Sequence, residues 1–220
     1  MDQRRARQQA LRKVKLYAVL TEAYCRKPWL EAAEGVLAGG ADVLQLREKE
    51  LEDGELLARA RTLRRLTEGY AALLIVNDRP DVAVLCGADG IHVGQGDLPP
   101  EEVRRLVGPD LIVGLSTHTP QQAAEAQERR ADYIGAGPAY ATATKGCSEG
   151  GGPELIARLC RATRLPVVAI GGVTPANARL LIEAGAHAVA ACGALCGAAD
   201  PQRAAREFLR ALSGGEGEAQ

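Results

Sequence analysis

Eight short apolar runs, each followed by a segment with helical character, constrain the fold of this chain more than any other feature. The runs lie at residues 16–20, 43–47, 72–76, 90–93, 111–116, 133–137, 166–172 and 188–193. Uniform alternation of strands and helices is typical of a parallel sheet that is buried on both faces. Eight such units in 220 residues predict an α/β fold, a single-domain (β/α)8 TIM barrel. A doubly wound open sheet is the alternative.

Polar residues gather at the C-terminal ends of several runs, which favours the barrel, because barrel enzymes build their sites there. The barrel is expected over residues 16–212, since no linker interrupts them. Residues 1–15 are basic and prone to form a helix, and residues 213–220 have the composition of a flexible tail. We expect the basic segment to add a helix that covers the N-terminal end of the barrel.

Charge and cysteine content exclude several classes of partner. The formal net charge is -1 at pH 7, so no overall field attracts nucleic acid or a membrane surface. No apolar run approaches the roughly 20 residues that span a bilayer, and the basic start lacks the apolar segment of a signal peptide. The six cysteines show no CxxC pair and no zinc-ligand spacing, which favours reduced thiols. These features predict a soluble cytoplasmic protein.

Two runs near the end of the chain finish in glycine, which indicates a phosphate site. PVVAIGG ends in Gly171 and Gly172, and HAVAACGAL contains Cys192 and Gly193. Glycine lets the backbone approach an anion closely, and backbone N–H groups with a following helix N-terminus supply donors. A phosphorylated small molecule is the expected ligand class. The alternative is that these glycines only turn a strand into a helix.

Cationic side chains alternate at the end of the second run. In LQLREKE, Gln45, Arg47 and Lys49 point the same way if the chain is extended, and Glu48 points to the other face. Arginine and lysine together suit a diphosphate. Alternatively, these long side chains simply reach solvent.

Carboxylates follow the third and fourth runs. Asn77 and Asp78 come directly after four apolar residues, and Asp97 follows the next run in GQGD. Mg2+ takes one or two carboxylates and completes its shell with waters and phosphate oxygens, so both aspartates are candidate ligands. The alternative is that they cap helices that begin near Pro80 and Pro99.

The fifth run ends in Ser116, and His118 follows in GLSTHT. The strand lacks the GxSxG nucleophile elbow and has no evident orienting acid, which favours a serine that donates to phosphate over a catalytic dyad. Thr119 is the expected helix N-cap before Pro120. His92 and His187 are interpreted as barrel or core histidines.

The sixth run leads into the polar loop GPAYATATKG, which contains Thr142, Thr144 and Lys145. Loops of this length above a barrel commonly act as lids that exclude water, and the glycines at residues 146–152 would let this one move. Lys145 would add another cation to the same rim.

The ordered set LQLREKE, IVNDRPDVAVLCGADGIHVGQGD, GLSTHT, GPAYATATKG, AIGGVTPAN and AVAACGAL resembles the thiamine-phosphate synthase family from about Leu16 to about Phe208. Members of that family are transferases that join hydroxymethylpyrimidine diphosphate to a thiazole phosphate, or its carboxylate, and release diphosphate. Two small-molecule substrates are therefore the expected partners, and the resemblance leaves room for a homo-oligomer.

The resemblance also implies a role for each matched position. Arg47, Lys49, Ser116 and Lys145 would be catalytic through the leaving diphosphate, and Asp78 and Asp97 would bind Mg2+. The implied substrate-binding residues are Gln45, Arg47, Lys49, Asn77, Ser116, Thr142, Thr144, Lys145, Gly171, Gly172, Cys192 and Gly193. In the family's dissociative chemistry the diphosphate leaves first and the thiazole nitrogen captures the resulting cation, so no strong base is required.

Two positions depart from the family pattern. Ala141 stands where a proline is usual in the lid motif, which should loosen the loop, and Gly193 stands where a serine commonly ends the eighth strand. The nearest alternative function is that of a thiazole tautomerase of the same ancestry, and a barrel that only binds thiamine precursors is another. The tautomerase group lacks an intact TxTK lid and commonly alters the cationic strand. The synthase is favoured because this sequence retains Gln45, Arg47, Lys49, Asn77, Asp78, Thr144 and Lys145.

Overall fold

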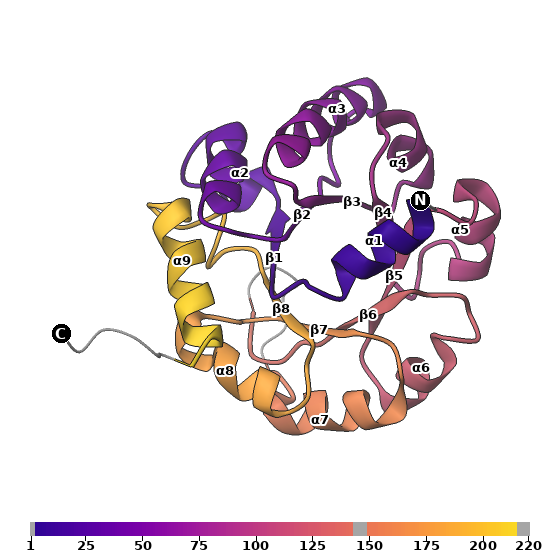
Figure 1. Cartoon of the computed structure of the whole chain (residues 1–220), viewed down its shortest axis with the longest axis vertical. Coiled ribbons are helices and arrows are strands. Elements are labelled where there is room, and N and C mark those ends of the chain that lie inside the picture. Colours follow the sequence, from indigo (N-terminus) through magenta and orange to yellow (C-terminus); the bar gives the residue numbers. More distant parts are fainter. Residues whose placement is uncertain (1–2, 143–148, 215–220) are drawn as a thin grey trace.

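Eight parallel strands close into a barrel, and each strand pairs with its neighbours in chain order (Figure 1). The computed structural model describes residues 3–142 and 149–214. The strands are β1 (Leu16–Leu20), β2 (Val43–Leu46), β3 (Leu73–Asn77), β4 (Gly90–Val93), β5 (Ile112–Thr117), β6 (Tyr133–Ala136), β7 (Val167–Ile170) and β8 (Ala188–Ala191). The predicted TIM barrel is confirmed, and the open sheet is wrong because β8 pairs with β1.

Helices form the outer layer of the barrel (Figure 1). They are α2 (Trp29–Ala38), α3 (Asp53–Gly69), α4 (Pro80–Cys86), α5 (Pro100–Val107), α6 (Pro120–Glu125), α7 (Gly152–Ala162), α8 (Pro175–Glu183) and α9 (Pro201–Leu212), and α1 (Gln3–Leu11) precedes β1. Each helix from α4 to α9 has a proline at its first or second position. Proline is tolerated there because a backbone N–H at that position would have no hydrogen-bond partner within the helix. Among the described helices, none combines the length and the apolar character needed to cross a membrane.

The strand side chains divide between two cores. In β1, Leu16, Ala18 and Leu20 pack in the layer between the barrel and its helices, whereas Tyr17 and Val19 belong to a separate cluster inside the barrel. This alternation follows from the period of two along a strand. Beyond this cluster, polar side chains at the C-terminal ends of the strands, such as Asn77 and Ser116, line a cavity.

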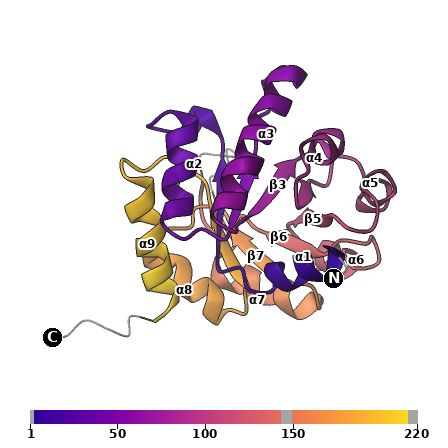
Figure 2. The same cartoon turned by 45° about the horizontal axis from the view of Figure 1, so that its top comes forward.

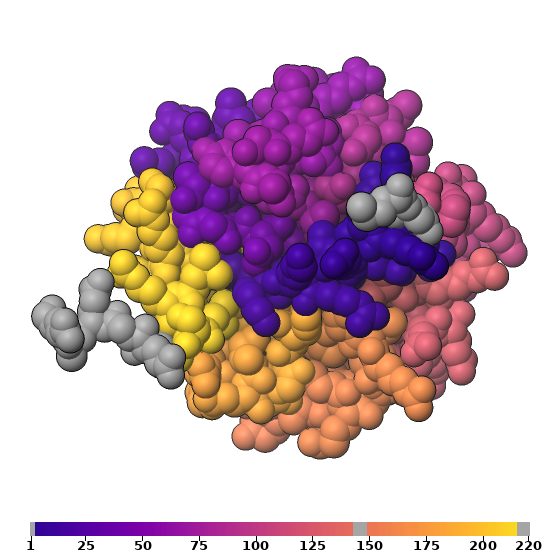
Figure 3. Space-filling view, viewed as in Figure 1, coloured from indigo at the N-terminus to yellow at the C-terminus, as the bar shows by residue number. Residues whose placement is uncertain are grey.

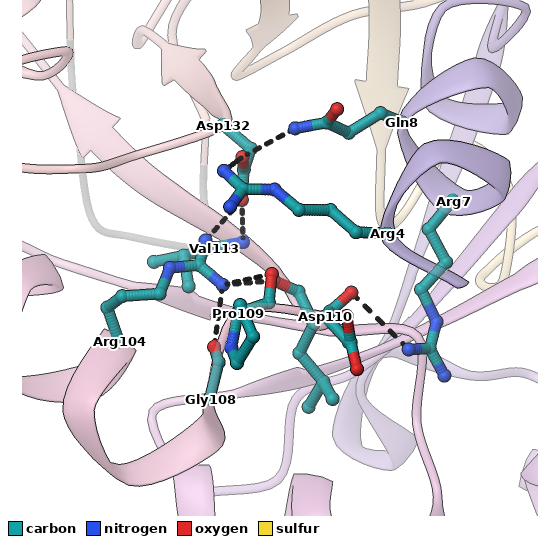
Figure 4. Close-up of polar contacts among 10 residues, drawn as sticks. Arg4, Arg7, Gln8, Arg104, Gly108, Pro109, Asp110, Val113 and Asp132 are labelled. Carbon is teal, nitrogen blue, oxygen red and sulfur yellow. Dashed lines mark hydrogen bonds and ion pairs between the residues drawn. The ribbon is translucent and has the colours of Figure 1, made fainter. Parts of the chain in front are cut away.

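Aspartates precede three of the even-numbered strands. Asp42, Asp89 and Asp132 each accept a 2.9 Å hydrogen bond from a backbone N–H of the preceding strand, donated by Leu16, Leu74 and Val113 respectively. Arg104 pairs with Asp132 and donates to nearby backbone carbonyls (Figure 4). These bonds hold the N-terminal ends of the strands in register, which leaves the other end for function.

Helix α1 crosses the N-terminal end of the barrel (Figures 1 and 2), and the space-filling view shows the N-terminal segment over the middle of this face (Figure 3). Leu11 and Val14 are buried in the interior cluster. Arg7 donates to the carboxylate of Asp89. Arg7 also donates to the carbonyl of Asp110, and Gln8 donates to the carboxylate of Asp132 (Figure 4). The segment thus closes the barrel at the end opposite the predicted site.

Candidate active site

A cavity of about 490 Å³ opens at the C-terminal end of the barrel, and most of the predicted site residues line it. These residues are Gln45, Arg47, Asn77, Ser116, Thr142, Gly171, Gly172, Cys192 and Gly193. They lie at or just beyond the ends of β2, β3, β5, β7 and β8 and in the segment that follows β6. They meet because parallel strands in a closed barrel all end on one rim.

The polar residues of the second strand divide between the cavity and its rim. Gln45 is buried and Arg47 is half-buried, and both line the cavity. Lys49 lies three residues beyond the end of β2, and its ammonium is 3.3 Å from Oδ2 of Asp78 rather than in the cavity lining. Glu48 lies near Arg59 instead. Of the predicted cationic wall, Arg47 therefore lines the cavity, whereas Lys49 lies beside Asp78 and outside the cavity lining.

The side chains of Asp78 and Asp97 lie beside the cavity, near enough for the Asp97 carboxylate to act on the charge of Asp78. Burial, together with the Asp97 carboxylate, raises the pKa of Asp78 above its usual range. Neither aspartate is a helix N-cap, because Arg79 and Pro99 hold those positions. The capping alternative is therefore wrong.

The donor chemistry of this pair fits Mg2+. Both side chains offer only oxygen, and the Asp97 carboxylate disfavours the charge of Asp78, which a divalent cation would offset. Within the described residues no group of three or more acidic, histidine or cysteine side chains forms a fuller ligand set. Any Mg2+ here would thus keep several waters or substrate oxygens, which is its usual preference.

Gly171 and Gly172 form the turn between β7 and α8. Their φ angles are 104° and 61°, a region that glycine adopts without strain. A Cβ on Gly171 would lie 2.8 Å from Cα of Pro138, and one on Gly172 would overlap the carbonyl of Ala141. The two glycines therefore turn a strand into a helix, as the alternative interpretation expected. They also form part of the cavity wall.

The end of β8 contributes Cys192 and Gly193. Burial raises the pKa of the Cys192 thiol to about 11, so the thiol is protonated at neutral pH and is not an activated nucleophile. A Cβ added at Gly193 would meet no atom within 4 Å. The described cysteines are all free thiols, as predicted: Cys25, Cys86, Cys160, Cys192 and Cys196.

The loop after β6 is tied to the glycine turn at its start. The N–H groups of Ala139 and Tyr140 donate to the carbonyls of Ile170 and Gly171, each at 2.9 Å. Ala141 and Thr142 then line the cavity. Thr144 and Lys145 lie outside the described residues, so their predicted roles stay predictions.

A series of hydrogen bonds crosses the cavity and joins His92, interpreted from the sequence as a barrel or core histidine, to four other polar side chains. His92 lines the cavity, with Nε2 2.9 Å from Oγ of Ser116 and Nδ1 2.9 Å from the hydroxyl of Tyr133. That hydroxyl is 2.9 Å from the hydroxyl of Tyr17, which accepts from Nε2 of Gln45 at 2.7 Å. We call these five side chains the relay.

Sequence reasoning missed Tyr17 and Tyr133, because each lies in an apolar run where an aromatic side chain is usually core. The available signal was a hydroxyl at an inward-facing strand position, where a buried tyrosine needs a partner. His118, although close to Ser116 in the sequence, bonds elsewhere: Nδ1 of His118 is 2.6 Å from the carbonyl oxygen of Gly137. Thr119 caps α6 as predicted.

Apolar side chains complete the cavity wall. Val19, Val168, Ile170 and Ala190 lie around the cavity. A concave site with an apolar wall and a few fixed polar groups suits a flat ring that carries an anionic group.

Comparison with known proteins agrees with this geometry. The sequence profile described as thiamine monophosphate synthase matches residues 16–195. The chain is 43% identical over 206 residues to the thiamine-phosphate synthase of Moorella thermoacetica, covering 92% of this chain and 97% of that protein. It is 45% identical over 206 residues to the thiamine-phosphate synthase of Laribacter hongkongensis, covering 90% and 95%. Among solved structures, the thiamine phosphate pyrophosphorylase of Pyrococcus furiosus matches with a TM-score of 0.86 at 36% identity, covering 94% of this chain and 100% of that one.

Proposed function

The chain belongs to the thiamine monophosphate synthase family and is a transferase of thiamine biosynthesis, and we propose how its cavity joins a pyrimidine diphosphate to a thiazole phosphate. The observation that carries the proposal is the convergence of Arg47, Asn77 and Ser116 with two glycine-rich strand ends around one cavity. A diphosphate needs cationic and hydroxyl donors, and a phosphate needs closely approaching backbone. Both are available on one rim.

We assign the two substrates to opposite sides of the cavity. Gln45, Arg47, Asn77 and Ser116, from β2, β3 and β5, would hold the pyrimidine diphosphate. Thr142, Gly171, Gly172, Cys192 and Gly193, from the loop after β6 and the ends of β7 and β8, would surround the thiazole phosphate. This division would place the thiazole ring next to the pyrimidine methylene carbon with the diphosphate on the far side.

Asp78 and Asp97 would hold Mg2+ at the edge of the cavity. When bound, the ion would neutralise charge that grows on the diphosphate as it leaves. Lys49, now 3.3 Å from Asp78, would be free to turn toward the diphosphate once a cation occupies the pair. Arg47 offers a planar fork for two phosphate oxygens.

The chain's own groups suit a dissociative reaction. Departure of diphosphate leaves a resonance-stabilised pyrimidine methylene cation, and the thiazole nitrogen then forms the new C–N bond. Such a reaction needs leaving-group stabilisation and positioning rather than a base or nucleophile. Because the Cys192 thiol stays protonated and part of the wall is apolar, the cavity would present no thiolate there to capture the cation in place of the thiazole nitrogen. The cytoplasmic location and the number of subunits stay predictions.

The test is diphosphate release by the wild-type protein with each substrate alone and with both. We expect release only when both substrates and Mg2+ are present, because capture by the thiazole makes departure productive. Release that is as fast without the thiazole phosphate as with it, or none at all from folded protein, would contradict the synthase reaction. In the latter case isomerisation of the thiazole phosphate alone is the measurement that would identify a tautomerase.

Gly193→Ser is expected to lower KM for the thiazole phosphate roughly two- to tenfold, the equivalent of one added hydrogen bond of about 0.5 to 1.5 kcal/mol. The added Cβ has open space, so the hydroxyl can be accommodated without displacing neighbours. Gly193→Ala is the matched control, because it adds the Cβ without the donor. An equal KM in wild type and Gly193→Ser would show that no phosphate oxygen lies at this position.

A further inference from the structure

The relay joins five strands through four consecutive hydrogen bonds. Gln45 of β2 contacts Tyr17 of β1, Tyr17 contacts Tyr133 of β6, and Tyr133 contacts His92 of β4, which contacts Ser116 of β5. Gln45, Tyr17, Tyr133 and Ser116 are all buried. A buried polar group that loses its partner carries a desolvation cost, so each bond here constrains the next.

The direction of every proton in the relay follows from its first member. Nε2 of Gln45 donates to the hydroxyl oxygen of Tyr17. Tyr17 is buried, and among the described residues its proton has one acceptor, the hydroxyl of Tyr133, so donation to Tyr133 avoids a buried donor without a partner. Tyr133 then donates its own proton to Nδ1 of His92. A neutral imidazole that accepts at Nδ1 carries its proton on Nε2, so His92 donates to Oγ of Ser116. The Ser116 proton is left pointing into the cavity.

We propose that the relay makes Ser116 a fixed hydrogen-bond donor toward the bound anion, with His92 and Tyr133 as positioning residues that act through it. The identity of that anion as diphosphate rests on the proposed function, but the proton order does not. A donor that is already oriented needs no rearrangement when negative charge develops on the leaving group.

The same order excludes a nucleophilic serine. Because Nε2 of His92 already carries a proton, it cannot accept the proton of Ser116, which a Ser–His hydrolase would require. Burial raises the pKa of both Tyr17 and Tyr133 well above the usual value for tyrosine, so both hydroxyls keep the protons on which the order depends. With this proton order, Ser116 binds the anion and does not act as a nucleophile.

The proton order can be read directly from the imidazole 15N spectrum of the full-length protein. The chain has three histidines, and His118 provides an internal comparison, because its Nδ1 faces a backbone carbonyl that can only accept. We expect the proton of His92 on Nε2 and that of His118 on Nδ1. In Tyr133→Phe the His92 assignment should become mixed while His118 is unchanged. A wild-type His92 with its proton on Nδ1 would reverse the relay and overturn the proposal.

Kinetics test whether His92 and Tyr133 act through Ser116. Tyr133→Phe should lower kcat/KM for the pyrimidine diphosphate roughly tenfold, about the worth of one oriented hydrogen bond, with KM for the thiazole phosphate unchanged. In a Ser116→Ala background the same change should add almost nothing. An equal loss in both backgrounds would overturn the coupling. Tyr70→Phe, at an exposed tyrosine, is the control, and thermal unfolding separates lost folding from lost function.

The two measurements keep this proposal separate from the proposed function. If wild-type protein releases no diphosphate but shows the expected 15N pattern, the proton order stands and only the anion has been misidentified. If diphosphate is released but His92 carries its proton on Nδ1, the synthase reaction stands and the relay is refuted.

Discussion

Asp78→Asn is expected to reduce Mg2+-dependent diphosphate release roughly a hundredfold or more, because metal assistance to a leaving group contributes several kcal/mol. The amide removes the anionic ligand but keeps nearly the same shape. The backbone should tolerate the change, since Asp78 has φ 61° and asparagine is among the residues that adopt this region most readily. The measurement is the initial rate of release as a function of Mg2+ concentration.

The same substitution should not destabilise the metal-free barrel. A carboxyl whose pKa is raised in the folded state binds its proton more tightly there than in the unfolded chain, so its charged form opposes folding at neutral pH. Asparagine removes that opposition and gives up only the Lys49 pair, whose lysine is half exposed. We therefore expect the Tm of Asp78→Asn without Mg2+ to be equal to or higher than that of wild type. Addition of Mg2+ should raise the Tm of the wild type only.

Asp81→Asn is the matched control for this prediction. Asp81 is an exposed carboxylate three residues further on, paired with Arg79. Its removal should leave both the rate and the Mg2+ dependence unchanged. Wild-type Mg2+ dependence in Asp78→Asn would instead place the metal elsewhere.

Gly114→Ala is expected to destabilise the protein by about 3 kcal/mol, at the upper end of what overpacking a core costs. Gly114 lies in β5 between His92 of β4 and Tyr133 of β6. A Cβ there would overlap both the ring of Tyr133 and Nδ1 of His92. Because these atoms belong to the relay inside a closed barrel, neither ring can move without breaking its hydrogen bonds.

The expected drop in Tm is roughly 10 °C for a chain of this size, accompanied by loss of activity in the fraction that remains folded. Thermal unfolding and the rate of diphosphate release measure the two effects. Gly54→Ala is the control, because Gly54 lies in the first turn of α3, where an added Cβ meets nothing within 4 Å; its stability should be unchanged or slightly raised. A Gly114→Ala protein as stable as wild type would mean that β5 can shift to make room.

Much of the site could be predicted because its residues lie where strand patterns end. The runs at residues 16–20 and 90–93 match β1 and β4, and the carboxylates and glycines that follow the runs come together on one rim. The local pattern suffices here, since a parallel barrel sends the end of every strand to the same place. Lys49 departs from the pattern because β2 ends at Leu46, after which strand alternation no longer fixes its direction.

The relay could not be predicted, because its members are separated by up to 116 residues and three of them, Tyr17, His92 and Tyr133, look like ordinary core within their own runs. Serine and histidine neighbours in GLSTHT suggested a pair, but the true partner of Ser116 comes from the adjacent strand, since strand pairing sets His92 opposite Gly114 and close to Ser116. Gly114, which no sequence pattern singled out, leaves room for the rings of His92 and Tyr133 because it has no side chain.

By itself the sequence determined the alternating strands and helices, the closed parallel barrel and the functional end of it, because hydrophobic periodicity and strand-end polarity are local properties. Only the tertiary structure decided which polar groups come together: Asp97 near Asp78, Lys49 with Asp78, and His92 with Ser116 and Tyr133. Those contacts depend on the register and stagger of neighbouring strands, which place residues distant in the chain within hydrogen-bond distance and which no single run encodes.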